Sequence, residues 1–428
     1  MPLPDFFRFP ARVQGPEHGG YMKEMTPTGR LWPFLGIVML LVLVAGLALP
    51  GLDRVRTASG DAIFYQYYIN FFLKAPVSEY PRLFDIYFNQ PQHTGFTTPI
   101  RPGYILPLAL LARIIGPSFF LMARVSLAAH LGTVLLAWFF LSRWQGPVVG
   151  LATAALVAFS PLLLGTATSP LMDGYNFFFF MLCTGLFIEA VRSRGRILLL
   201  AAFGAVFAFF LVVRENNVLF VIPFFLFCLY ERFFQKKPLP LFRFGIALGL
   251  PCFLALGAYI AITGSPSGLI RIVRLLMSVG SSNPYTRATG LGPWYRYLID
   301  FLTLSPATTV LAICYFGFAV LGKPSAGLSS ELRFFLIFLP VLLIIYAPLP
   351  KCVRYLCVLD LPIRLFCVLF IHEWLERAPG AKRYAIFSAV VAGLCFLDFS
   401  SYDYLFVESN LYDPISQHLL YYRFIINS

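Results

Sequence analysis

The stretch Ser59-Gly60-Asp61-Ala62-Ile63-Phe64-Tyr65 follows the first long apolar run of the chain, Leu31 to Leu49. Beyond Asp61, apolar side chains recur at i, i+3, i+4, i+7 and i+8, which is one face of a helix: Phe64, Tyr67, Tyr68, Phe71 and Phe72. The sequence Lys74-Ala75-Pro76 ends this helix. The pattern predicts a carboxylate at the point where a membrane span gives way to an amphipathic helix on the bilayer surface. A helix N-terminal role, in which Asp61 complements the helix dipole, is the alternative interpretation.

Composition identifies the class of protein. Of the 428 residues, 59% are hydrophobic and 12% are charged, whereas a soluble domain carries about 25% charged residues. The chain is therefore expected to be an integral membrane protein. Its formal charge of +13 fits cytoplasmic loops and lipid phosphates, so it does not require a nucleic acid partner. The eight cysteines lie in or beside apolar runs without metal-ligand spacing, which predicts small core residues.

The apolar runs predict an all-α, polytopic membrane protein with about eleven spans. Residues 1–30 mix Pro, Gly and both charge signs without a helical period, which predicts a disordered cytoplasmic head. A membrane domain, 31–400, would hold two long outer loops, 51–118 and 263–304, and an outer or interfacial tail would follow at 401–428. The predicted spans are 31–50, 119–142, 147–165, 174–191, 197–213, 217–230, 241–262, 305–321, 332–347, 355–374 and 384–400.

Orientation follows from the basic loops. The apolar segment 103–115 has about thirteen residues, fewer than the roughly twenty needed to cross a bilayer. Leaving it out of the spans places Arg143 and the run Arg192-Ser193-Arg194-Gly195-Arg196 in the cytoplasm, as the positive-inside rule requires. The N-terminus is then cytoplasmic and the C-terminus outside. A bacterial inner membrane is the expected location, with the functional site on the outer face.

The second long outer loop also predicts an interfacial helix. One face of this helix carries Leu269, Ile270, Val273, Leu276 and Met277, and another face carries Arg271 and Arg274. The aromatic residues that follow in the loop are expected at the level of the lipid headgroups. They are Trp294, Tyr295 and Tyr297.

Two acids, Asp61 and Asp173, are predicted at the outer boundary of the membrane. Asp173 lies in the short turn Ser169-Pro170-Leu171-Met172-Asp173-Gly174-Tyr175. Carboxylates in the first two outer loops could share a cleft, which is where a base must lie to reach an acceptor hydroxyl. For Asp173, as for Asp61, a helix cap is the alternative interpretation.

Two cations, Arg214 and Arg354, lie at the predicted outer ends of spans. A guanidinium in a membrane segment costs about 2.5–3.5 kcal/mol on insertion scales, and a charge-assisted bond to phosphate returns about 1.5–3 kcal/mol. Such residues therefore persist mainly where they have a partner. The alternatives are a salt bridge from Arg214 to Glu215 or to another acid, and snorkelling of Arg354 to the interface.

Other polar residues favour structural roles. His130 is expected to be a hydrogen-bonded interior residue, and Asp360 and Arg364, four apart in one span, are expected to pair. A divalent metal is possible but no motif supports it, and no cofactor is assigned. The residues that could hold such a metal are His93, Glu79 and Asp85.

Five short segments occur in an order that resembles the GT-C superfamily of membrane glycosyltransferases, especially bacterial enzymes similar to protein O-mannosyltransferases and aminoarabinose transferases. The resemblance covers about 31–375. The chain departs from this pattern in three ways. Many members have Asp-Glu in the first loop, whereas here Ala62 follows the acid, and the common Pro-Pro pair is replaced by Pro102-Gly103. The large outer C-terminal domain of some members is not found in this sequence. The five segments are Gly60-Asp61, Arg101-Pro102-Gly103-Tyr104 through Gly116, Ser160-Pro161 followed by Asp173, Val213-Arg214-Glu215-Asn216, and Arg354-Tyr355 through Pro362.

The resemblance implies a hexosyl- or pentosyltransferase that takes a sugar from a polyprenyl-phosphate donor. The sugar would pass with inversion to a hydroxyl of a lipid, glycan or protein acceptor at the outer face. Asp61 would be the catalytic base, and Asp173 would orient the acceptor or assist the base. The residues implied in substrate binding are Arg354, Tyr355, Arg214, Arg101 and Tyr65.

Two other classes of function share some of these features. A flippase or transporter of lipid-linked glycans should cluster its ionisable residues near the midplane, whereas the candidates here lie at outer span ends. A surface-glycan polymerase or ligase would use the same kind of donor. A non-catalytic membrane partner of an assembly is a further alternative.

Overall fold

The computed structural model describes residues 27–52, 60–89, 97–282, 293, 295–322, 328–349, 352–376 and 380–409. The described residues are helical or irregular and include no strand. The α-helices are α1 (Pro27–Leu52), α2 (Gly60–Lys74), α3 (Tyr80–Phe88), α4 (Pro102–Ile115), α5 (Phe119–Gln145), α6 (Pro147–Ala158), α7 (Pro161–Ala167), α8 (Asp173–Arg192), α9 (Ile197–Val213), α10 (Val221–Leu229), α11 (Leu241–Thr263), α12 (Pro266–Ser282), α14 (Arg296–Leu304), α15 (Pro306–Leu321), α16 (Ser330–Tyr346), α17 (Asp360–Leu375) and α18 (Gly380–Tyr402).

Shorter helical segments extend or connect these helices. Three have 3₁₀ geometry and two are π-helical turns, which continue α10 and α18. The 3₁₀ segments are η2 (Val77–Glu79), η4 (Glu215–Phe220) and η6 (Val353–Leu359), and the π-helical turns are η5 (Tyr230–Phe234) and η7 (Asp403–Glu408).

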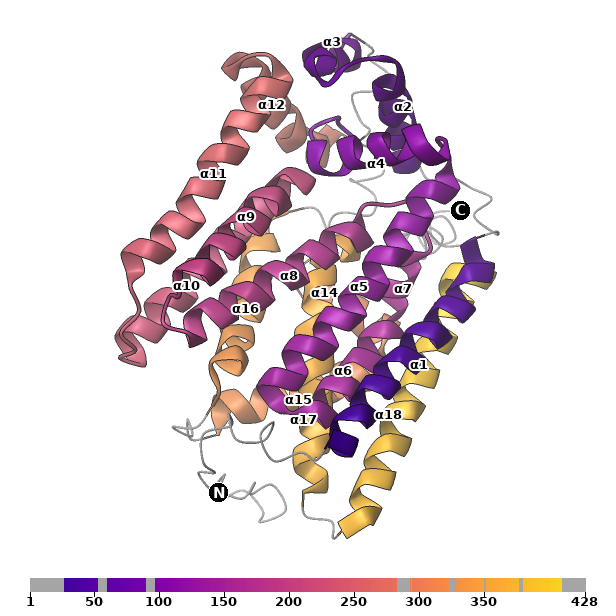
Figure 1. Cartoon of the computed structure of the whole chain (residues 1–428), viewed down its shortest axis with the longest axis vertical. Coiled ribbons are helices and arrows are strands. Elements are labelled where there is room, and N and C mark those ends of the chain that lie inside the picture. Colours follow the sequence, from indigo (N-terminus) through magenta and orange to yellow (C-terminus); the bar gives the residue numbers. More distant parts are fainter. Residues whose placement is uncertain are drawn as a thin grey trace.

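The expected all-α, polytopic membrane fold is confirmed. Within the described residues, seven helices are long and apolar enough to cross a membrane, and α6 with α7, bent by 59°, makes an eighth. The other three predicted spans correspond to α9, α15 and α16, which have 17, 16 and 17 residues. Each of the eleven predicted spans is thus a helix or a broken helix. Figure 1 shows most of them running side by side in one bundle.

The helix α4, which was predicted not to cross, lies at one end of the bundle. Figure 1 shows it lying across that end, with α2, α3 and α12 gathered around it. Pro102 occupies its first turn, and Gly116 follows it with φ of 94°, a conformation that suits glycine. A Cβ on Gly103 would lie 2.8 Å from the backbone nitrogen of Val213. Gly103 therefore allows the start of α4 to approach the end of α9.

The prediction of which side chains form the apolar, lipid-facing side of α2 is partly wrong. Tyr65, Tyr68, Ile69 and Phe72 are buried, whereas Tyr67 is 42% exposed. The buried side chains pack on the other outer helices, with ring centroids 4.9 Å apart for Tyr65 and Tyr104 and 4.7 Å apart for Phe72 and Tyr80. Because α3 and α4 offer protein partners at this end of the bundle, the aromatic side of α2 is covered by protein.

The second predicted amphipathic helix is α12. Its Ile272 is buried, while Ile270, Val273 and Met277 form an exposed apolar stripe. The guanidinium carbon of Arg271 lies 3.9 Å from the ring centroid of Phe88 on α3. The helix thus packs on the outer layer by one side and leaves an apolar stripe uncovered by the described residues.

Of the aromatic residues that were expected at headgroup level, Tyr297 is covered by protein. This residue lies in α14 and is fully buried, whereas Tyr295 is 48% exposed. Trp294 lies outside the described residues. Because α14 packs against α15 and η6, its inner side belongs to the protein core.

The interior polar residues confirm two predictions and add a second acid to one of them. The imidazole Nε2 of His130 lies 3.1 Å from the carbonyl oxygen of Ala158. Arg364 donates to Asp360 at 2.6 Å, as predicted, and also to Asp398 of α18. Five of the eight cysteines are buried, and none forms a disulfide. The polar cluster around Arg364 therefore joins α17 to α18 inside the bundle.

The predicted boundaries at the two ends of the chain also change. The first helix begins at Pro27, inside the predicted head, and residues 1–26 lie outside the described residues. At the other end, helical structure continues beyond residue 400 through η7 to Glu408. The rest of the predicted tail, 410–428, is also outside the described residues.

Candidate functional site

Four structural elements bring the predicted acids and cations together. Asp61 lies in the first turn of α2, and α8 begins at Asp173. Arg214 follows α9 in an extended conformation, with φ −149° and ψ 131°, so the chain turns there into η4. Arg354 lies at the start of η6, which leads into α17. These positions are far apart in the sequence and converge only through the packing of the bundle.

The guanidinium of Arg354 lies between the two predicted acids. Its Nη1 is 3.1 Å from Oδ2 of Asp173, and its Nη2 is 3.5 Å from Oδ2 of Asp61. The Asp61 side chain is 32% exposed, against 4% for Asp173. Asp173 does not cap its helix, since the cap position is Met172 and makes no side-chain bond. Asp61 is therefore the accessible acid of the pair, and Asp173 is the buried one.

Arg214 also binds Asp173, so the interpretation that it forms a salt bridge with an acid is confirmed, and the acid is Asp173 rather than Glu215. Its Nη1 lies 2.9 Å from Oδ1 of Asp173, and its guanidinium carbon lies 4.8 Å from the ring centroid of Tyr355. Its Nε is buried and has no hydrogen-bond partner among the described residues. Asp173 is thus held by two arginines, and one of them retains a donor group that forms no bond within the described protein.

Glu215 pairs instead with Arg101, at the start of α4. The pair is bidentate, with Nε to Oε2 at 2.9 Å and Nη2 to Oε1 at 2.8 Å. Arg101 also donates through Nη1 to the hydroxyl of Tyr65. Burial raises the pKa of the Tyr65 hydroxyl well above its usual value. Tyr65 therefore stays protonated, and it accepts from Arg101 while keeping its own proton for donation.

Thr97 belongs to this site but was missed from the sequence. Its hydroxyl donates to Oδ1 of Asp61. Two buried tyrosines hold this segment, because the Tyr68 hydroxyl lies 2.6 Å from the carbonyl oxygen of Thr97 and the Tyr80 hydroxyl lies 2.9 Å from that of Pro99. No spacing rule links Thr97 to an acid 36 residues earlier, so only the folded outer layer could reveal this contact.

The site is electrically balanced. The site contains three arginines and three acids, so their formal charges cancel. All seven residues of the predicted catalytic and substrate-binding set lie in or beside this network. A ligand phosphate would add negative charge, and it would compete with the carboxylates for the guanidinium groups. The acids are Asp61, Asp173 and Glu215, and the arginines are Arg101, Arg214 and Arg354.

No group of three or more His, Cys, Asp or Glu side chains in the described part of the chain is placed to hold a metal ion. Of the residues considered for a metal from the sequence, Glu79 and Asp85 lie in η2 and α3, and His93 falls outside the described ranges. In this structure the positive charge that lies between the carboxylates of Asp61 and Asp173 is the guanidinium of Arg354.

No protein-family model and no curated protein sequence matches the chain. Among solved structures, it is similar to the archaeal oligosaccharyltransferase AglB from Archaeoglobus fulgidus in complex with an inhibitory peptide and a dolichol-phosphate. The two share 11% sequence identity with a TM-score of 0.57, over 88% of this chain and 56% of the archaeal one. The chain thus spans little more than half the length of that protein. The likeness establishes a GT-C-like fold.

Proposed function

Because the chain has a GT-C-like membrane fold with a charged network at one end of its bundle, we propose that it transfers a sugar from a polyprenyl-phosphate donor to an acceptor hydroxyl. The observation that carries this proposal is the position of Arg354 between an accessible and a buried acid, with Arg214 close by. A phosphate-binding cation next to a potential base is what displacement of a sugar from phosphate requires.

The donor phosphate would bind to Arg354 and to the unbonded Nε of Arg214. Fork-shaped guanidinium groups suit phosphate oxygens, because two N–H groups can bond at once. Arg101 and Tyr65 would lie beside the sugar or the second face of the phosphate. In the resting site Arg354 binds Asp61, so the arriving phosphate would draw Arg354 away and leave the Asp61 carboxylate available as a base.

The proposed reaction is a single displacement. The acceptor oxygen attacks the anomeric carbon, a new C–O bond forms, and the bond from that carbon to the phosphate oxygen breaks. The electron pair leaves with the phosphate, where the arginines stabilise the added charge. The acceptor proton passes to Asp61. Because the nucleophile enters opposite the leaving group, the anomeric configuration inverts.

The test uses the full chain, purified into nanodiscs, with polyprenyl-phosphate donors that carry different radiolabelled sugars and with bacterial envelope fractions as acceptors. We expect label to move from the lipid to an acceptor and free polyprenyl phosphate to appear in equal amount. A flippase reconstituted in vesicles would move the intact donor across the bilayer without cleaving it. Translocation without cleavage of any donor would contradict the proposal.

Thr97 provides a test of how Asp61 is held. Thr97→Val removes the hydroxyl that donates to Asp61 and keeps the side-chain shape. Hydrogen bonding to a carboxylate favours its charged form, so its loss should move the acidic limb of the kcat/KM profile to higher pH. The loss of activity relative to the wild type should therefore be largest at acidic pH.

The matched control is Thr98→Val. Thr98 is the next residue, is buried, and its hydroxyl has no hydrogen-bond partner among the described residues. The Thr98→Val variant should leave the pH profile unchanged. Identical profiles for the Thr97 and Thr98 variants would show that the Thr97 contact does not influence the reaction.

A further inference from the structure

The turn between α9 and η4 carries Arg214. The helix α9 ends one position earlier, Arg214 is extended, and η4 begins directly after it. The last four carbonyl groups of an α-helix have no partner within the helix. In α9 two of them accept from side chains. The carbonyl oxygen of Phe210 lies 2.6 Å from Nδ2 of Asn217, and that of Leu211 accepts from the hydroxyl of Tyr259. The turn is therefore fixed by side-chain hydrogen bonds.

A second contact of Asn217 ties this turn to α8. Its Nδ2 also donates to Oδ1 of Asn176 at 2.7 Å. Asn176 lies three residues after Asp173 in α8. Asn217 likewise lies three residues after Arg214, and its backbone N–H donates to the carbonyl oxygen of Arg214 at 3.1 Å. Residues three apart lie on the same side of an α-helix or a 3₁₀ segment. The ion pair of Asp173 with Arg214 at 2.9 Å and the amide contact therefore join the same two elements, one turn apart.

The amide contact is buried and fixed in direction. The four side chains of the two contacts are each at most 5% exposed. The carbonyl of Phe210 can only accept a hydrogen bond, so Asn217 must present its amide nitrogen there, which leaves the second N–H of that nitrogen for the side-chain oxygen of Asn176. Because the contact is neutral, it competes neither for the Asp173 carboxylate nor for the guanidinium of Arg214.

Arg214 is the residue that this arrangement constrains. Its Nη1 binds Asp173, and its Nε is buried without a partner among the described residues. A second acid, Glu215, adjoins it in the sequence but pairs with Arg101. An arginine side chain has several rotatable bonds, and the groups of a functional site need supporting hydrogen bonds to stay within about 0.5 Å of their working positions. The amide contact supplies such support, because it fixes the backbone from which Arg214 extends.

We propose that Asn176 and Asn217 are positioning residues for the donor phosphate. Their contact fixes the turn after α9 against α8, so that Arg214 stays on Asp173 and its Nε remains available to a phosphate oxygen. Neither asparagine touches the donor in this arrangement, and both act through Arg214. This role rests on the proposed function, because it takes Arg214 as a ligand of the phosphate.

The test measures how tightly the full chain in nanodiscs binds a radiolabelled polyprenyl phosphate that carries no sugar. Asn176→Leu removes the acceptor oxygen, while Asn217 keeps its bond to the carbonyl of Phe210. We expect the dissociation constant to rise about two- to tenfold, the lower part of the range of coupling between contacting residues. The matched control is Thr184→Val, which should leave the constant unchanged. Thr184 is a buried residue of the same helix, and its hydroxyl has no hydrogen-bond partner among the described residues.

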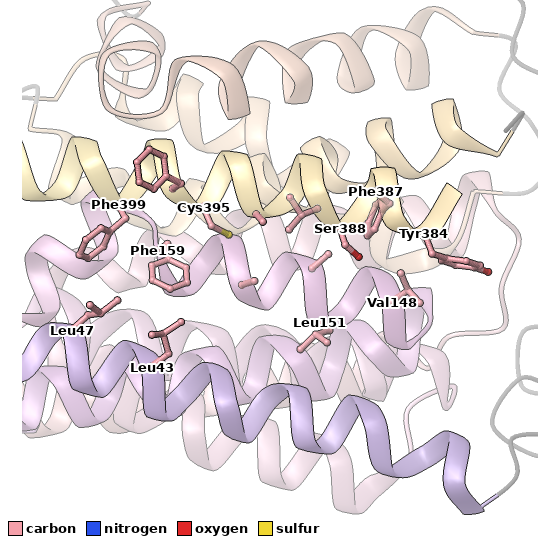
Figure 2. A pocket seen from close by; sticks show the side chains of 15 residues that line it. Leu43, Leu47, Val148, Leu151, Phe159, Tyr384, Phe387, Ser388, Cys395 and Phe399 are labelled. Atoms are coloured by element: carbon pink, nitrogen blue, oxygen red, sulfur yellow. The ribbon is translucent and has the colours of Figure 1, made fainter. Parts of the chain in front are cut away.

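A second control removes a polar group elsewhere in the bundle. Ser388 lines an apolar pocket between α1, α6 and α18 (Figure 2), helices that carry no residue of the charged network. Ser388→Ala should bind polyprenyl phosphate as the wild type does. If Asn176→Leu does not fold, Asn176→Ala removes the same oxygen without adding side-chain volume, and the same weakening of binding is expected.

A double variant with Arg214→Ala distinguishes positioning from a structural role. If Asn176 acts through Arg214, adding Asn176→Leu to Arg214→Ala should weaken polyprenyl phosphate binding no further. An equal loss in both backgrounds would show that Asn176 acts on the fold, and it would overturn the proposal. Equal affinity of Asn176→Leu and Thr184→Val would also overturn it, while leaving the proposed reaction intact. A wild-type chain that binds no polyprenyl phosphate would contradict the proposed phosphate site, and the positioning role with it.

Discussion

Replacing Arg354 by alanine is expected to lower kcat/KM for the lipid-linked donor by about 10- to 200-fold, the equivalent of roughly 1.5–3 kcal/mol for a charge-assisted bond to phosphate. The loss should appear mainly as a higher KM for the donor, since the guanidinium would contact the phosphate before and during transfer. Arg354→Lys should lose less, because lysine keeps the charge but not the fork geometry. Donor titrations in nanodiscs give both constants.

Arg354 also holds Asp61 and Asp173, so the variant needs a structural control. Asp173 keeps its bond to Arg214 at 2.9 Å in the absence of Arg354, which should limit the loss of stability. Arg143→Ala removes an arginine of a half-exposed pair with Glu189 and should leave donor kinetics unchanged. If Arg354→Ala shows the donor constants of the wild type, Arg354 does not bind the phosphate, and the proposed orientation of the donor is wrong.

Much of the fold follows from local sequence. The length of an apolar run is set by bilayer thickness, so each predicted span corresponds to a helix. The short run 103–115 was set apart by its length together with the alternation of the basic loops. Local patterns also predicted the helix that follows Asp61. They could not predict which side of α2 is buried, because that depends on where α3 and α4 pack.

The candidate site was predictable as a set of residue types at the same predicted level of the membrane. Asp61, Asp173, Arg214 and Arg354 are polar groups at the ends of apolar runs, and such groups are expensive unless partnered. Their pairing was not predictable. Sequence proximity suggested Glu215 as the partner of Arg214, but Gly103 lets α4 approach the end of α9, and Arg101 takes Glu215 instead.

The same reason explains the partners that the sequence did not indicate. Asp398 of α18 contacts Arg364 of α17, and Thr97, in the first outer loop, contacts Asp61 of α2. Neither contact has a fixed spacing along the chain. Helical periodicity relates residues three or four apart, so contacts between separate elements require the packed structure.

Replacing Asp61 by asparagine is expected to reduce kcat by about 10²–10⁴, the usual contribution of general base catalysis. Asparagine has nearly the same shape, and its amide oxygen can still accept the hydrogen bond from Thr97. It cannot take up the acceptor proton. Removing the charge also frees Arg354 from its resting ion pair, so donor KM should stay the same or fall, in contrast to the rise expected for Arg354→Ala.

This opposite direction of the two KM changes distinguishes a base from a structural residue. Single-turnover transfer with labelled donor measures the chemical step, and donor binding is measured separately by retention of the labelled lipid on immobilised nanodiscs. Asp85→Asn, at an exposed acid of α3 in the same outer layer, serves as the matched control and should behave as wild type. If Asp61→Asn transfers sugar at the rate of Asp85→Asn, then Asp61 acts only at the start of its helix and as a partner of Arg354. The acceptor proton must in that case pass to another group, and Asp173, whose side chain is 4% exposed against 32% for Asp61, is less accessible to an acceptor.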